Sequence, residues 1–177
     1  MDNFRGKSII LIGFMGTGKT IVGRLLAERL GREFIDTDEL VEEAMGLSIP
    51  LIFRRYGESR FRAEEKAAVA RATARQGAVI ATGGGAVLDP ENVARLKEAG
   101  VIIWLQATPE AIFERTGRGE GRPLLEGRHS VEVIAGLLER RMPYYQQAAD
   151  LIINTTGRPP EEIARQIEQE LNLWSPN

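Results

Sequence analysis

Five short apolar runs alternate along the chain with longer segments that have the periodicity of helices. The first run, from Ser8 to Ile12, is apolar at every position after its serine, as expected for a strand buried on both faces of a sheet. Two later runs, Ala78 to Ala81 and Val101 to Leu105, have the same character. The pattern predicts five strands, at residues 8–12, 33–35, 78–81, 101–105 and 150–154.

The segments between these strands carry the signals of helices. After the first strand, apolar residues recur at positions 21, 22, 25, 26 and 30, which is the spacing of one helix face. Asp89-Pro90 and Thr108-Pro109 each combine a capping residue with proline at the first helical position. Gly57 is expected to end one helix. We predict helices at about 18–30, 39–45, 48–56, 58–76, 90–99, 109–116, 131–147 and 159–171.

Strands that alternate with helices predict an α/β fold, in which a five-stranded parallel sheet lies between two layers of helices. We expect residues 1–177 to form a single domain with its core at about 8–171, because no linker or repeat divides them. Ligands of such sheets bind at the carboxyl ends of the strands. The loops at those ends are 13–20, 36–38, 83–85 and the loop after Leu105, and the predicted site depends on their sharing one edge.

Composition and charge narrow the possible functions. Hydrophobic residues make up 43% of the chain and charged residues 27%, as in ordinary soluble proteins, and the net charge is −2. This charge does not indicate a nucleic-acid or membrane-surface binder. The chain has no cysteine, which excludes disulfides and thiolate metal sites, and it has no leader-like or membrane-spanning apolar run. We therefore expect a cytoplasmic monomer that acts on small molecules, without nucleic-acid or membrane partners.

The loop after the first strand carries the most specific motif. It reads Gly13-Phe14-Met15-Gly16-Thr17-Gly18-Lys19-Thr20 and fits the phosphate-binding pattern G-x-x-x-x-G-K-[ST]. Glycines let backbone N–H groups approach an anion, the lysine adds charge for the β- and γ-phosphates, and the threonine hydroxyl suits Mg²⁺. The helix that begins at about Gly18 directs its positive dipole end toward the same anion. The order strand, loop, helix favours a nucleotide site over a glycine-rich turn with a solvated lysine.

Two aspartates follow the second strand. Asp36 and Asp38 are two residues apart, so both side chains would fall on one face if the strand continued through them. One carboxylate could then hold the water shell of Mg²⁺, and the other could meet an acceptor hydroxyl. The alternative is that one aspartate caps the next helix and the other is solvated. A phosphate-binding loop at the same edge favours the functional interpretation.

A triple glycine follows the third strand, in Thr82-Gly83-Gly84-Gly85. Consecutive glycines are costly in backbone entropy, which suggests that a ligand approaches the main chain closely there. The alternative is a tight turn.

Arginines supply the planar, bidentate partner that an anionic acceptor needs. Two pairs are candidates, Arg60 with Arg62 and Arg140 with Arg141, and the sequence alone does not choose among the four.

The segment 117–128 is rich in glycine, lacks periodicity and is predicted to be a mobile loop. It carries Arg118, Arg122 and Arg128, and a loop arginine that closes over a transferring phosphate can neutralise its developing charge. His129, the only histidine, has no obvious partner and is predicted to be a surface residue.

With these motifs in view, the chain resembles the shikimate kinases over about Ser8 to Leu171. The specific motifs occur in the family's order and at similar spacing: Asp36-Thr37-Asp38, Phe61-Arg62 with Glu64-Glu65, Gly83-Gly84-Gly85-Ala86-Val87, Arg122-Pro123-Leu124-Leu125 and Arg141-x-Pro-x-Tyr. The resemblance implies a P-loop fold of the nucleoside-monophosphate-kinase type. It also implies a shikimate-binding helical region at about 37–62 and a lid at about 116–129.

The resemblance implies roles for the matching residues of the donor side. Lys19 would contact the phosphates of ATP, Thr20 would ligate Mg²⁺, and Asp36 would act on the metal through water. Arg115 resembles the residue that stacks on adenine, and the residues around Arg158 resemble the other wall of the adenine pocket. The residues implied in ATP binding are Gly13, Gly16, Thr17, Gly18, Lys19, Thr20, Arg115, Arg122 and Arg158.

On the acceptor side, the resemblance implies that Asp38 hydrogen-bonds the acceptor hydroxyls and assists loss of the attacking proton. Arg62 and Arg141 would clamp the shikimate carboxylate. Arg122, in the lid, would reach phosphate and acceptor together, and with Lys19 and Asp38 it would complete the catalytic set. Backbone N–H groups beside the substrate would come from Gly83, Gly84 and Gly85.

The implied reaction is transfer of the ATP γ-phosphoryl group to the 3-hydroxyl of shikimate, with Mg²⁺, in aromatic amino acid biosynthesis. One alternative is a related small-molecule kinase that acts on gluconate or a nucleoside monophosphate. The two aspartates and the triple glycine argue against it through the resemblance alone. A second alternative is a nucleotide-dependent switch or binding protein without a small acceptor, against which Asp38 and the arginine-bearing lid argue.

Overall fold

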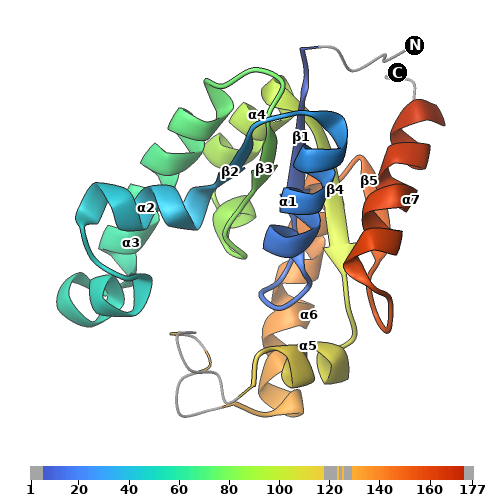
Figure 1. The fold of residues 1–177 in the computed structure, drawn as a ribbon. Helices are drawn as coiled ribbons and strands as arrows, with labels where there is room; N and C mark the ends of the chain where they lie inside the picture. Colours follow the sequence, from blue (N-terminus) through green and yellow to red (C-terminus); the bar gives the residue numbers. More distant parts are fainter. Residues whose placement is uncertain (1–5, 118–122, 124, 126–128, 174–177) are drawn as a thin grey trace.

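A computed structural model of the 177-residue chain describes residues 6–117, 123, 125 and 129–173. Its centre is one sheet of five parallel strands in the order β2-β3-β1-β4-β5 (Figure 1). Ile10 of the central strand pairs with Ile80 on one side and with Ile102 on the other, so the carboxyl ends of the strands meet at one edge. The strands are β1 (Ser8–Ile12), β2 (Phe34–Asp36), β3 (Val79–Ala81), β4 (Gly100–Gln106) and β5 (Leu151–Asn154).

Helices cover both faces of this sheet. Along β1, Ile9 and Leu11 pack with α1 (Lys19–Leu30) and α7 (Pro160–Leu173). Ile10 and Ile12 point to the opposite face, because successive side chains of a strand alternate. That face is covered by α3 (Ile49–Thr73), α4 (Pro90–Ala99) and α6 (Val131–Ala148).

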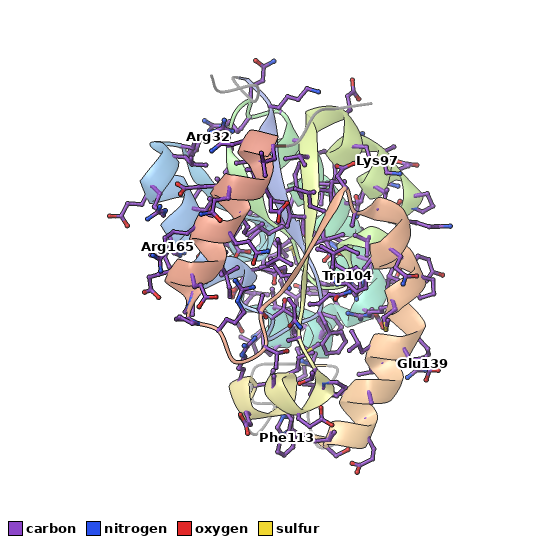
Figure 2. All side chains as sticks on the ribbon, turned by 90° about the vertical axis from the view of Figure 1, so that its right-hand side faces the viewer. Arg32, Lys97, Trp104, Phe113, Glu139 and Arg165 are labelled. Carbon is purple, nitrogen blue, oxygen red and sulfur yellow. The ribbon has the colours of Figure 1, made fainter. Side chains whose placement is uncertain are left out.

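Figure 2, which views the β5 edge of the sheet, shows the layers directly. Helices α7 and α6 lie on opposite sides of the strands, with Trp104 inside the molecule and Arg165 and Glu139 on its outer sides. The predicted three-layer α/β fold with a five-stranded parallel sheet is confirmed. Within the described ranges, no helix is both long enough and apolar enough to cross a bilayer.

A smaller apolar cluster extends the structure beyond β2 (Figure 1, left). It joins α2 (Thr37–Met45) to α3 and contains Val41, Ile52, Phe61 and Ala68. This cluster holds the helices that follow β2 against the carboxyl edge of the sheet. Two short elements complete the fold, α5 (Pro109–Arg115) and the 3₁₀ turn η1 (Ala86–Leu88).

Two element predictions need correction, and one short element was not predicted. Helix α2 begins at Thr37 and not at 39, because Asp36 already serves as its cap. The helices predicted at 48–56 and 58–76 form one element, α3, with a kink at Gly57, where φ is 81° and ψ is 173°. The turn η1 was not predicted, since three residues give no periodicity to read.

Candidate active site

The phosphate-binding loop has the conformation that its glycines allow. The φ angles of Gly13, Gly16 and Gly18 are 145°, 75° and 98°, values that side chains with a Cβ rarely adopt. A Cβ on Gly13 would also lie only 2.5 Å from the carbonyl oxygen of Leu105. Lys19 curls over the loop, with its Nζ donating to the carbonyl oxygens of Gly13 at 2.7 Å and Phe14 at 2.8 Å. The loop therefore presents its lysine at the carboxyl edge of β1, as predicted.

Asp36 connects this loop to the second strand. Its Oδ2 accepts a hydrogen bond from the Thr20 hydroxyl at 2.9 Å, and its Oδ1 accepts one from the backbone N–H of Asp38 at 2.9 Å. Asp36 thus caps α2 and touches the phosphate-binding loop at the same time. The premise that Asp36 and Asp38 share one face of a continuing strand is wrong, because the strand ends at Asp36 and a helix begins. Asp38 reaches the site from the first turn of that helix.

The donor set around Thr20 fits a magnesium ion. A hydroxyl and a carboxylate lie side by side next to the phosphate-binding lysine. Mg²⁺ is usually held by one or two such protein oxygens, with waters and substrate phosphates completing its shell. No cluster of three or more His, Cys, Asp or Glu side chains suited to a metal occurs among the described residues.

One cleft of about 270 Å³ brings the predicted acceptor residues together. Lys19, Asp38, Arg62 and Arg141 all line it, with Gly83 to Gly85 as its floor. Three of the four predicted loops, 13–20, 36–38 and 83–85, thus meet in this cleft, together with side chains from α3 and α6. The fourth, after Leu105, lies beside Phe14 and Thr17 of the phosphate-binding loop at the same edge. An apolar wall of the cleft consists of Ile49, Pro50, Phe53 and Phe61.

The triple glycine makes room for the charged side chains of this cleft. A Cβ on Gly83 would lie 2.8 Å from Asp38 Oδ1, and one on Gly84 would lie 3.3 Å from Arg141 Nη1. A Cβ on Gly85 would overlap the guanidinium of Arg62, at 2.6 Å from Nη2 and 2.7 Å from Cζ. Each glycine is thus approached by a different charged side chain, so close packing explains the three glycines better than a tight turn alone.

The structure shows which two of the four candidate arginines line the cleft. Arg62 and Arg141 face the cleft, and Arg141 is buried with its guanidinium 5.5 Å from the ring centre of Phe14. Arg60 instead pairs with Glu64 at 2.9 Å on the surface. Arg140 is exposed and donates to the carbonyl oxygen of Gly136.

Glu65 is a site residue for which the motifs predicted no role. Its Oε1 accepts a hydrogen bond from Arg62 Nη1 at 2.9 Å, and a Cβ on Gly83 would lie 2.6 Å from its Oε2. Burial raises the pKa of this carboxyl, against the opposing charges of Arg62 and Arg141. The pKa of Arg62 is raised in turn, since the carboxylates of Glu65 and Glu58 outweigh its own burial. A signal was present, because Glu65 follows Phe61 by four residues and precedes Val69 by four on one buried helix face.

Tyr145 is the second residue that the sequence left without a role. It is fully buried on α6, and its hydroxyl donates to the carbonyl oxygen of Gly84 at 2.5 Å. Burial raises its pKa to about 12, although the charge of Arg141 acts in the other direction. Its ring stacks on Trp104 with 5.5 Å between centroids.

On the nucleotide side, Thr155 joins the end of β5 to the phosphate-binding loop. Its hydroxyl donates to the carbonyl oxygens of Thr17 at 3.0 Å and Gln106 at 2.9 Å. Arg115 Nη1 donates to the same hydroxyl at 3.0 Å, and its Nη2 donates to the Thr155 carbonyl at 2.7 Å. Arg158 lies three residues after Thr155 and donates to the carbonyl oxygen of Asn154 at 2.8 Å. Arg115, at the end of α5, and Arg158, before α7, thus both donate to the backbone at the end of β5. Their contact with adenine stays a prediction.

Two further predictions concern the end of the lid. His129 does have partners, because its Nε2 lies 2.8 Å from the Thr116 hydroxyl and its ring stacks on Phe113 with centroids 4.4 Å apart. Arg118, Arg122 and Arg128 lie outside the described residues, so their predicted roles stay predictions.

Comparison with known proteins identifies the family of this chain. The family model described as shikimate kinase matches residues 15–172 of the chain. The chain belongs to the shikimate kinase family. This membership confirms the resemblance read from the motifs and the nucleoside-monophosphate-kinase type of fold.

Individual members of the shikimate kinase family are similar over nearly the whole chain. The shikimate kinase of Moorella thermoacetica is 55% identical over 168 residues, which cover 94% of this chain and 95% of that protein. The shikimate kinase of Thermodesulfovibrio yellowstonii is 50% identical over 169 residues, covering 96% and 97%.

Solved structures agree with the sequence comparisons. A shikimate kinase from Acinetobacter baumannii in complex with shikimate has a TM-score of 0.92 at 38% identity, covering 96% of this chain and 95% of that chain. A gluconokinase from Sinorhizobium meliloti has a TM-score of 0.57 at 18% identity and covers 95% and 93%, which shows a common fold alone.

Proposed function

We propose that this protein transfers the γ-phosphoryl group of ATP to the 3-hydroxyl of shikimate, giving shikimate 3-phosphate and ADP for aromatic amino acid biosynthesis. The observation that carries the proposal is the single cleft in which Lys19, Asp38, Arg62 and Arg141 meet. Membership of the shikimate kinase family and the names of the relatives support it. The shikimate-bound structure of the A. baumannii relative supports the choice of acceptor.

The donor would be held by the phosphate-binding loop and the N-terminus of α1. Lys19 would leave the carbonyl oxygens that it now contacts for the β- and γ-phosphates, where its charge is needed. Mg²⁺ would be held by the Thr20 hydroxyl and, through water, by Asp36, and when bound it supplies positive charge on the transferring phosphoryl group. Arg115 and Arg158 would flank the adenine.

The acceptor would occupy the cleft beside the triple glycine. Arg62 and Arg141 enter from two different helices and would hold the shikimate carboxylate. The apolar wall formed by Ile49, Pro50, Phe53 and Phe61 suits the carbon face of a ring. Asp38 would receive the hydroxyl that attacks.

In the transfer, a bond forms between the acceptor oxygen and the γ-phosphorus, and the bond from that phosphorus to the β–γ bridging oxygen breaks. The proton of the attacking hydroxyl passes to Asp38. Lys19 stabilises the negative charge that develops on the phosphoryl group and on ADP. Positioning and charge stabilisation supply most of the catalysis in such transfers, so the geometry of the cleft is the main contribution of the protein.

The first experiment measures ADP release with shikimate, gluconate, AMP and CMP as acceptors. Only shikimate is expected to stimulate release strongly. Stimulation by gluconate or by a nucleotide would favour a related kinase, and no stimulation by any acceptor would favour a nucleotide switch.

The role of Asp38 is tested by Asp38→Asn, which keeps the shape of the side chain and removes its basicity. We expect kcat to fall about 100-fold or more, as for loss of a positioned base, with ATP binding nearly unchanged. Glu39→Gln is the matched control, because Glu39 is the next residue of α2 and its carboxylate pairs with Arg24 on the surface. Retained turnover in Asp38→Asn would remove this residue from the mechanism.

The proposal also includes a single kinase domain and a cytoplasmic monomer. Light scattering on the purified protein tests the oligomeric state, with one chain of 19.6 kDa as the expected mass.

A further inference from the structure

Tyr145 contacts the cleft from behind its glycine floor. Its hydroxyl donates to the carbonyl oxygen of Gly84 at 2.5 Å, from a position on α6 four residues after Arg141. Arg141 lies one helical turn earlier, its charge acts on the same hydroxyl, and its Nη1 lies 3.3 Å from the place that a Cβ on Gly84 would take. One hydroxyl therefore holds the backbone of the acceptor site and lies in the electrostatic reach of one of its arginines.

The bond to Gly84 also fixes the orientation of the next N–H group. The carbonyl of Gly84 and the N–H of Gly85 belong to one planar peptide group, in which they point in opposite directions. The turn η1 does not use this N–H, because its bonds run from Ala86 N–H to Gly83 O and from Leu88 N–H to Gly85 O, both at 3.1 Å. Gly85 lines the cleft. With the Gly84 carbonyl held by Tyr145 from behind, the Gly85 N–H would point the other way, toward an acceptor in the cleft.

We propose that Tyr145 is a positioning residue whose hydroxyl orients the Gly84–Gly85 peptide and the Arg141 guanidinium toward the carboxylate of the acceptor. The inference rests on the proposed shikimate kinase activity and deepens it. Tyr145 touches neither reacting group, so it acts on acceptor recognition and leaves the nucleotide site alone. Its ring serves a separate purpose, since stacking on Trp104 fixes α6 against the sheet.

The chemistry of the hydroxyl suits this role. Because burial raises the pKa of Tyr145 to about 12, the group stays protonated and remains a donor through the neutral and mildly alkaline range. A phenylalanine ring at this position would keep the stacking and lose only the donor. The Gly84 carbonyl would then be free to turn, and the Gly85 N–H would turn with it.

The test is the steady-state kinetics of Tyr145→Phe with shikimate and with ATP. We expect the KM for shikimate to rise about tenfold, which corresponds to one lost hydrogen bond, while the KM for ATP stays within about twofold. Tyr144→Phe is the matched control, because the neighbouring tyrosine is 45% exposed and its hydroxyl should not affect either constant.

A second variant separates packing from orientation. Trp104→Phe weakens the stacking but leaves the Tyr145 hydroxyl in place, so it should lower Tm without raising the KM for shikimate. Equal shikimate KM values for wild type and Tyr145→Phe would overturn the inference and leave the kinase activity intact. A Tyr145→Phe protein that is unstable, or in which both KM values rise, would show a role in the fold instead. A wild-type protein that is inactive on shikimate would overturn the proposed function itself.

Discussion

At the scale of single residues, the site is made of charged side chains that lie on buried helix faces. Arg141 lies on the same face of α6 as Ile134, Tyr145 and Ala148, whereas its neighbour Arg140 points to solvent. A charged residue within an apolar helical stripe must find partners in the interior, because an unpaired buried charge is strongly unfavourable. The sequence predicted the residue types and the motifs of the site. The helical spacing of Ile134, Arg141 and Tyr145 would also have shown that Arg141, and not Arg140, lies on the buried face of α6.

Gly85 offers a direct test of the packing against Arg62. Its φ is −102°, so alanine fits the backbone, but the added Cβ would overlap the guanidinium of Arg62. We expect Gly85→Ala to displace Arg62 and to raise the KM for shikimate about tenfold or more, as when one partner of a charge pair is moved. The KM for ATP should not change. Steady-state kinetics with each substrate varied in turn measure both constants.

Gly136→Ala is the control for this substitution. Gly136 lies within α6, and a Cβ there would meet nothing within 4 Å. This variant should keep both KM values and gain up to about 1 kcal/mol of stability from helix propensity. A normal KM for shikimate in Gly85→Ala would mean that Arg62 does not hold the acceptor.

Glu65 makes stability depend on pH in a predictable direction. The pKa of its carboxyl is raised from an ordinary 4.5, mainly by burial, so the folded state binds this proton more tightly than the unfolded state does. The free energy of unfolding therefore falls as pH rises from the ordinary value to the raised one. Glu65→Gln removes this titration, and the stability of the variant relative to wild type should increase with pH over that interval.

Urea unfolding of both proteins, repeated from pH 4.5 to neutral, measures this difference. A difference that stays constant with pH would contradict the raised pKa of Glu65. The same variant keeps an oxygen for Arg62 Nη1 but loses the charge, so its KM for shikimate reports how much of the orientation of Arg62 is electrostatic.

At the scale of elements, the kink in α3 decides where Arg62 and Glu65 lie. The first part of the helix packs on α2 through Ile52, and the second part packs on the sheet through Val69 and Ala72. One straight helix would not serve both contacts. Gly57 absorbs the change of direction with φ 81° and ψ 173°, a region open essentially to glycine alone.

Gly57→Ala should therefore affect both stability and recognition. We expect a loss of about 1–3 kcal/mol of unfolding free energy from backbone strain, together with a higher KM for shikimate as the second part of α3 shifts. Gly31→Ala is the matched control, because Gly31 also has a positive φ, at 63°, but ends α1 in open space. The control should lose stability and keep its KM, and a similar result for Gly57→Ala would show that the kink does not position Arg62.

The element boundaries show what local pattern can and cannot predict. The helix signals at Asp89-Pro90 and Thr108-Pro109 were correct to the residue, because a cap and a proline act within one turn. The start of α2 was placed two residues late. Asp36 is both the last residue of β2 and the cap of α2, and its other carboxylate oxygen accepts from Thr20, which is distant in the sequence.

At the scale of the whole molecule, the order of the strands was beyond the reach of the sequence. Buried parallel strands such as Ile9 to Ile12 and Val101 to Leu105 look alike in apolar pattern, so nothing local states which neighbours they choose. The edge at which the site lies was predictable all the same, because every parallel strand ends at the same side whatever the order. The position of the cleft could therefore be inferred from strand direction alone. Which side chains line it could not.

The two edges of the sheet also differ in electrostatics, and this gives a last prediction. At the carboxyl edge, α1 and α2 begin, and helix N-termini favour anions. At the opposite edge, α3 and α4 end around a cavity of about 430 Å³ that is larger than the active-site cleft and contains Lys7, Arg75 and Arg95. Helix C-termini favour basic side chains and disfavour anions. Arg75 also pairs with Glu33 at 3.6 Å, and Glu98 lines the same cavity, so the basic side chains there are explained without a ligand.

We therefore expect Arg95→Gln to leave kcat and both KM values within about twofold of wild type and to change stability by less than about 0.5 kcal/mol, as for an ordinary surface substitution. Arg62→Gln, the same change at the carboxyl edge, should raise the KM for shikimate strongly, because it leaves the proposed acceptor carboxylate with one arginine. If Arg95→Gln raised the KM for shikimate as much as Arg62→Gln, cavity size and basic charge would decide where the acceptor binds, and the direction of the strands would not. The position of this site would then have to be explained without the polarity of the sheet.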